Sequence, residues 1–153
     1  MISIRNIFML NISHYKIIAI GKIKKRWIQE GIEMYSKRLP GLELLEIKDS
    51  TQRKEEQMIK ENLKKNETLV TLNENGHSFS SKQLAKKLLD SQNQNITFVI
   101  GGPSGLSSSL NSSASWQLSL SPLTFPHEIA RLLLIEQLYR AKTITQGGPY
   151  HKE

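Results

Sequence analysis

The residues best suited to binding a ligand lie in two uncharged segments, each of which follows an apolar, strand-like run. Residues 96–100 end abruptly at Gly101-Gly102-Pro103-Ser104-Gly105, and residues 116–120 lead into Ser121-Pro122-Leu123-Thr124-Phe125-Pro126-His127. No Lys, Arg, Asp or Glu occurs between Ser91 and Phe125, although 23% of the whole chain is charged. Ligands of open α/β sheets bind at the carboxyl ends of strands. The pattern therefore predicts a site here that is buried or closes on a neutral group.

The glycine-rich segment does not match the common nucleotide or nucleophile motifs. It lacks the G-x-G-x-x-G pattern of dinucleotide sites, and the chain has no Gly-Lys-Ser/Thr for a triphosphate loop. Ser104 is not in a nucleophile elbow, because Leu106 stands where that motif needs glycine. No metal-ligand spacing such as H-E-x-x-H occurs, so no metal is predicted.

Glycines let backbone amides and carbonyls come close to a ligand. An apolar floor from Leu72, Ile100, Leu120 and Leu123 would then suit a flat ring edged with donors and acceptors, such as adenine. The alternative is that the glycines only permit tight turns.

Composition indicates one compact, basic domain. The chain has 153 residues, of which 38% are hydrophobic, and a formal net charge of +7. This charge favours polyanionic partners. The basic cluster Lys22, Lys24, Lys25 and Arg26 follows a strand end, so it is either a solvated loop or a phosphate contact. There is no cysteine and no run of ~18–20 apolar residues, which fits a cytoplasmic protein.

Strands and helices are expected to alternate along the chain. Strand patterns cover residues 15–20, 42–47, 68–72, 96–100 and 116–120, and helical patterns cover 27–39, 53–65, 81–90 and 127–142. Residues 73–76 have the composition of a turn, and residues 106–115 are either a flexible loop or a short helix. The alternation predicts an α/β fold with a mainly parallel sheet and helices on both faces.

The last helix is apolar on nearly all sides. Such a helix must be covered on both faces, and in a small chain a second copy is the simplest cover. We therefore expect a two-fold homodimer. Residues 1–14 are expected to be a disordered or loosely attached extension, with Met9 as an alternative start, and residues 15–153 to form the single domain.

Four segments together resemble the RlmH family of bacterial SPOUT-class methyltransferases, which modify a pseudouridine of 23S ribosomal RNA at N3. They are KIIAIGK, FVIGGPSGL, LSLSPLTFPHEIARLLLIEQLYRA and the terminal PYHKE, in the family's order. The resemblance covers residues 16–153. It implies an α/β fold with a C-terminal trefoil knot, a homodimer, 23S rRNA on the ribosome as substrate, and S-adenosylmethionine as cofactor.

By position, the resemblance also implies a set of cofactor contacts at the ends of three strands. They are Leu72, Gly101, Gly102, Gly105, Leu120, Ser121, Pro122, Leu123, Thr124 and Phe125.

Methylating N3 requires an exposed base, loss of the ring proton and alignment with the methyl group. His151 is the first candidate for the proton acceptor and His127 the second. Tyr150 is a candidate for stacking on the target base, and Arg140 and Lys152 are candidates for holding phosphate or a developing oxyanion. The alternatives are that His127 caps a helix, Tyr150 packs and Arg140 makes an interface ion pair.

Lys152 stands where the family commonly has arginine, and lysine cannot make a bidentate contact with phosphate. Three rival functions remain: a methyltransferase with another target such as tRNA, a non-catalytic ribosome-binding protein that uses the basic cluster, and a poorly supported small-molecule reductase.

Overall fold

The computed structural model describes residues 9–152. Its core is a five-stranded, all-parallel sheet with strand order β2-β1-β4-β3-β5. The strands are β1 (Tyr15–Ile20), β2 (Glu43–Ile47), β3 (Glu67–Ser78), β4 (Asn95–Ile100) and β5 (Trp116–Ser119). The helices are η1 (Ile12–His14), α2 (Arg26–Lys37), α3 (Gln52–Glu61), α4 (Ser81–Asp90), α5 (Ser108–Ser113) and α6 (His127–Thr145).

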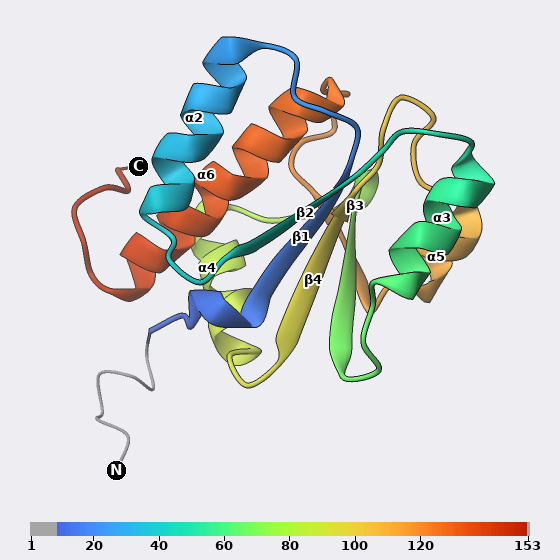
Figure 1. The fold of residues 1–153 in the computed structure, drawn as a ribbon. Helices are drawn as coiled ribbons and strands as arrows, with labels where there is room; N and C mark the ends of the chain where they lie inside the picture. The colour runs from blue at the N-terminus through green and yellow to red at the C-terminus, as the bar shows by residue number, and fades with distance from the viewer. Residues whose placement is uncertain (1–8, 153) are drawn as a thin grey trace.

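The sheet separates two hydrophobic clusters. On one face, α2, α4 and α6 pack together, and on the other lie α3 and α5 (Figure 1). Each residue of β1 is buried, as expected for a parallel strand covered on both faces. The predicted α/β class, parallel sheet and two helical layers are confirmed.

Most predicted elements form within a few residues of their expected ends, and residues 106–115 contain the short helix α5. Residues 73–76 were wrongly predicted to be a turn that ends β3. The strand continues to Ser78, because both Leu72 and His77 pair with Leu118 of β5 and the residues between them bulge out. A bulge can carry turn-type residues without ending a strand.

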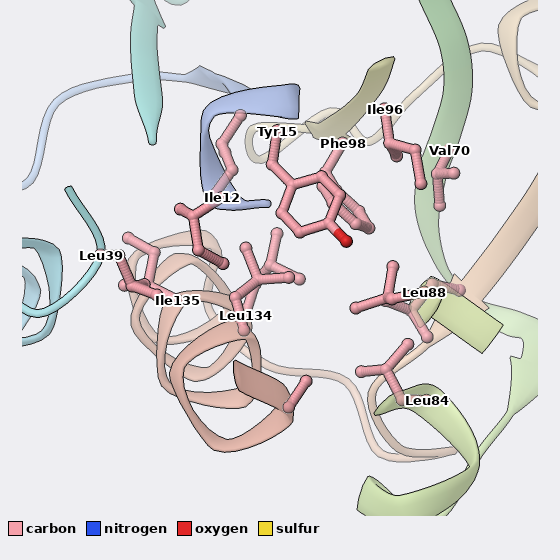
Figure 2. Packing of buried hydrophobic residues seen from close by; sticks show 14 of the residues in the cluster. Ile12, Tyr15, Leu39, Val70, Leu84, Leu88, Ile96, Phe98, Leu134 and Ile135 are labelled. Carbon is pink, nitrogen blue, oxygen red and sulfur yellow. The ribbon is translucent and has the colours of Figure 1, made fainter. Parts of the chain in front are cut away.

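Residues 9–14 differ from the predicted loose extension. Leu10 and Ile12 are buried in the cluster that also contains Tyr15. Figure 2 shows the side chains of Ile12 and Tyr15 in one cluster with those of Leu134 and Ile135 of α6. The apolar side chains of this short segment are therefore part of the domain core; residues 1–8 lie outside the described part of the chain.

Tyr15 packs edge-on against Phe98, and its hydroxyl has no hydrogen-bond partner among residues 9–152. Burial raises the pKa of this hydroxyl. Because a buried, unpaired hydroxyl costs free energy, we expect Tyr15→Phe to raise the free energy of unfolding by up to ~1 kcal/mol, measured by urea denaturation.

The same substitution should change how the free energy of unfolding depends on pH. Above about pH 10 the unfolded tyrosine loses its proton while the buried one keeps it. The free energy of unfolding should therefore fall with rising pH in the original protein, and fall less in Tyr15→Phe. A variant destabilised by more than ~1 kcal/mol would instead mean that the hydroxyl bonds a buried water.

Helix α6 is flanked within the same chain by α2 and α4 (Figure 1). Gly31 of α2 lies so close to Leu132 that an added Cβ would stand 3.0 Å from Leu132 Cδ1. The homodimer was predicted from the apolar surface on all sides of this helix, and that prediction did not consider that α2 and α4 cover part of it. What remains partly exposed on α6 includes Ile129 and Leu133.

Candidate active site

A cavity of about 610 Å³ lies at the carboxyl edge of the sheet. It is bounded by the bulged middle part of β3, the loop after β4, the loop after β5 and the first turn of α6. Its volume is within the ~300–1,000 Å³ usual for small-molecule sites. Nine of the ten predicted cofactor residues line it: Leu72, Gly101, Gly102, Gly105, Leu120, Ser121, Leu123, Thr124 and Phe125. Pro122, the tenth, is exposed and is not among the lining residues.

The glycine loop is shaped by close backbone contacts. Gly105 N–H donates to the Gly102 carbonyl at 2.9 Å. A Cβ on Gly101 would lie 2.9 Å from the Gly105 carbonyl carbon, and one on Gly102 would lie 2.9 Å from Ile20 Cγ2. Gly105 has a φ of +69° and nothing within 4 Å of its Cβ position. The first two glycines are therefore required by packing within the protein itself, as the tight-turn alternative proposed, while the loop also forms a wall of the cavity.

The bulge of β3 adds Asn73 and Glu74 to the cavity wall. The Glu74 carboxylate accepts a hydrogen bond from Thr124 Oγ1, and the Glu74 carbonyl accepts one from Ser119 Oγ at 3.0 Å. The sequence pattern placed a turn here and missed both residues. Their position next to the end of a predicted strand was the signal that could have found them.

His127 lines the cavity and lies against the end of β1, because a Cβ on Gly21 would stand 3.3 Å from its Nε2. It does not cap α6, whose N-cap residue is Pro126. Two further residues of α6, Glu128 and Arg131, bind the main chain of the loop after β1. Glu128 Oε1 accepts from the Lys24 and Lys25 amides at 2.5 and 3.2 Å.

Arg131 holds the same loop from a buried position. It is 6% exposed, and its guanidinium donates to the Gly21 carbonyl and to Glu46 Oε2, each at 2.7 Å. The main chain of the basic loop is thus fixed beside His127 and the cavity.

All four residues of the predicted basic cluster, Lys22, Lys24, Lys25 and Arg26, are exposed. Within residues 9–152, the only ion pair of Arg26 is with Glu30 one helical turn away, at 3.1 Å. Exposed pairs of this kind contribute little to stability, so these cations remain accessible to a partner.

The C-terminal tail folds back onto α2 and α6. Arg140 donates to Glu136 Oε1 through Nε at 3.0 Å and Nη2 at 2.6 Å, and these bonds raise the pKa of Arg140. Tyr150 donates to the same carboxylate oxygen at 3.0 Å and contacts the Tyr35 hydroxyl at 3.0 Å. Burial, followed by these two hydrogen bonds, raises the pKa of Tyr150.

Within one chain, Tyr150 packs against Tyr139 with ring centroids 4.7 Å apart, and Arg140 lies over its ring at 4.8 Å. The structure therefore places Arg140, Tyr150 and His151 in one cluster, with the exposed Lys152 next in the chain.

His151 receives a hydrogen bond at Nδ1 from Arg140 Nη1, at 3.1 Å. Arginine has no acceptor, so Nδ1 accepts and the neutral ring carries its proton on Nε2. Nε2 is buried and has no partner among the described residues. In this arrangement the neutral His151 ring carries its proton on a buried Nε2, and its role as proton acceptor stays a prediction.

The tail cluster and the cavity lie at opposite ends of α6. Arg140 is 13 positions after His127, which corresponds to about 20 Å along the helix axis at ~1.5 Å per residue. The structure thus joins nine predicted cofactor residues and His127 in one place, and the other three predicted catalytic residues in another.

The described residues contain no helix long and apolar enough to cross a membrane. Nor does any group of three or more His, Asp or Glu side chains in residues 9–152 have the arrangement to hold a metal ion.

Comparison with known proteins places the chain among methyltransferases. The family described as "Predicted SPOUT methyltransferase" matches residues 13–151. A protein of Prochlorococcus marinus (strain NATL2A), called "Ribosomal RNA large subunit methyltransferase H", is 86% identical over 145 residues, which cover 95% of this chain and 100% of that protein. The chain belongs to the RlmH family of SPOUT methyltransferases.

Another RlmH protein is more distant. The one from Prochlorococcus marinus (strain MIT 9211) is 55% identical over 94% of this chain and 99% of its own. Among solved structures, a probable methylase family protein from Haemophilus influenzae Rd KW20 has a TM-score of 0.60 at 12% identity, covering 94% of this chain and 72% of that chain. A probable methyltransferase from Bordetella pertussis Tohama I has a TM-score of 0.53 at 13% identity, covering 90% and 99%. These two structures share this chain's fold.

Proposed function

We propose that this chain methylates N3 of a pseudouridine in large-subunit ribosomal RNA, using S-adenosylmethionine. The observation that carries the proposal is the cavity, which brings nine predicted cofactor residues together in a chain that belongs to the RlmH family. The named activity of the 86% identical relative supports the same substrate class.

The volume and the lining of the cavity support this cofactor. Leu72, Ile100 and Leu120 provide apolar walls, and the backbone of residues 101–105 provides amides and carbonyls at close range. Such a site suits an adenine ring and its ribose. The bound cofactor would supply a methyl group on a positively charged sulfur. The chain's own task is then to orient the RNA base and to accommodate the proton that leaves N3.

We further propose a homodimer in which each cavity is completed by the tail of the second copy. Within one chain about 20 Å of helix separates His127 from Arg140, so the tail does not serve its own cavity. Exposed apolar side chains offer a surface for the second copy: Trp27 is 58% exposed and Met34 44% exposed. They are seven residues apart on α2 and so share one face, and α2 lies beside α6 (Figure 1).

In this dimer the basic loop and Lys152 would contact RNA phosphates. The loop main chain is held by Glu128 and Arg131, while its side chains are exposed. Fixed cations next to a reaction site position the RNA backbone. His151 Nε2 is buried within its own chain, so it would donate to the target base only after the tail moves, and His127, which lines the cavity, would accept the proton from N3.

We also propose the trefoil knot of the family and a cytoplasmic location with the ribosome. In support of the knot, β5 pairs with β3 at one edge of the sheet, yet the chain then returns to pack His127 against Gly21 at the end of β1. Knots are rare in proteins. An experimental structure in which the chain does not pass through a loop of its own backbone would contradict the knot.

The function is tested by titrating the purified protein calorimetrically with S-adenosylmethionine, followed by mass mapping of methylated RNA. We expect one donor site per chain and one methylated pseudouridine when ribosomes or large subunits are supplied. Methylation of bulk tRNA in preference to ribosomes would support the rival RNA target. Salt-sensitive RNA binding without donor binding would support the non-catalytic rival.

The shared site is tested by co-expressing two variants, Gly101→Ala and His151→Ala, each impaired alone. If the tail acts on the second copy's cavity, a mixed dimer contains one intact site and recovers activity. If the tail acts on its own cavity, both sites of the mixed dimer are defective, and no recovery is seen.

A further inference from the structure

The cavity contains one carboxylate that the proposed reaction does not use. Glu74 is the only Lys, Arg, Asp or Glu among the described residues that line it. The other walls come mainly from the uncharged segment between Ser91 and Phe125. Glu74 enters from β3, outside that segment, and so gives an otherwise neutral site a single negative charge.

The fold holds the bulge that carries Glu74 against β5. The bulge lies between Leu72 and His77, both paired with Leu118. Asn73 Nδ2 donates to Gln117 Oε1 at 2.7 Å, and a Cβ on Gly76 would lie 2.7 Å from the Gln117 carbonyl oxygen. The bulge is thus packed tightly against β5 at both ends.

The side chain is held as well. Thr124 Oγ1 donates to Glu74 Oε2, which links the bulge to the loop after β5, and Glu74 Oε1 accepts no hydrogen bond from the described residues. Thr124 is itself a lining residue. One carboxylate oxygen therefore fixes the side chain, while the other remains available to a ligand.

We propose that Glu74 makes the cavity selective for a donor with positively charged sulfur over the neutral thioether left after methyl transfer. This inference rests on the proposed function. The donor and its product share the adenosine, the ammonium and the carboxylate, and differ in the methyl group and in the charge on sulfur. A fixed carboxylate attracts the cation and has little effect on a neutral sulfur. The consequence is that the product competes less well with the donor for the cavity.

The test compares the original protein with Glu74→Gln by isothermal titration with S-adenosylmethionine and, separately, S-adenosylhomocysteine. Glutamine has nearly the same shape, and its side-chain oxygen still accepts from Thr124, so only the charge is removed. We expect donor affinity to fall about tenfold, which corresponds to ~1.4 kcal/mol, and product affinity to change by less than about twofold. The donor effect should shrink at high salt.

Glu43→Gln is the matched control, because it removes one carboxylate charge at an exposed position of β2 that does not line the cavity, and it should leave both affinities unchanged. Equal changes for donor and product in Glu74→Gln, or no change in either, would overturn the inference. Failure of the original protein to bind the donor would instead overturn the proposed function.

Discussion

Replacing Gly101 by alanine is expected to lower methylation by roughly 100-fold, the scale of loss from a misplacement of about 1 Å in a reactive complex. The added Cβ would lie 2.9 Å from the Gly105 carbonyl carbon and 3.1 Å from the Leu106 amide nitrogen. These are backbone atoms, so the loop itself must move, and the loop is one wall of the cavity. Calorimetric donor binding and methylation of ribosomes measure the effect.

Gly105→Ala is the matched control in the same loop. Its φ of +69° makes alanine strained by ~1–2 kcal/mol, but the Cβ meets nothing within 4 Å. We expect donor binding to suffer much less than in Gly101→Ala. If Gly101→Ala folds normally, as judged by circular dichroism, and binds donor as the original does, the loop does not form the donor site.

Replacing His151 by alanine is expected to leave donor affinity nearly unchanged and to lower turnover by about 100-fold, at the low end of the effect of a positioned proton-transfer group. The cavity lies about 20 Å along α6 from Arg140, which holds His151. An intact cavity should therefore bind donor normally. Turnover would fall because the target RNA base loses its contact with the His151 ring.

His151→Gln separates the two roles open to the histidine. Because Arg140 donates to Nδ1 at 3.1 Å, the neutral ring offers an N–H at Nε2, and the amide of glutamine offers a similar donor. We expect His151→Gln to keep activity within roughly tenfold of the original, since a neutral hydrogen bond contributes ~0.5–1.5 kcal/mol. If glutamine is as damaging as alanine and the acidic limb of the pH–rate profile disappears, His151 acts as the base after all.

Local patterns in the chain were sufficient for the parallel sheet and for most of the cavity. Apolar runs that end at glycine or proline mark strands β4 and β5, and parallel strands bring their carboxyl ends to one edge. The glycine loop and the segment after β5 therefore had to meet there. The family resemblance added which atoms to expect in contact with a cofactor.

Other features depend on contacts between distant residues and left no local signal. Asn73 to Gly76 has the composition of a turn, yet Leu118 pairs on both sides of it and makes it a bulge that carries Glu74 into the cavity. The burial of Leu10 and Ile12 likewise depends on the packing of α6 against them.

The sequence by itself determined the composition of the site, because glycine, proline and uncharged side chains restrict what the backbone can approach. Only the tertiary structure decided where the tail with the predicted catalytic residues lies. The order of residues along α6 does not say what each can reach until they form one helix, which puts His127 and Arg140 about 20 Å apart. The tautomer of His151 was decided in the same way, by an arginine eleven residues away that folding brings to 3.1 Å.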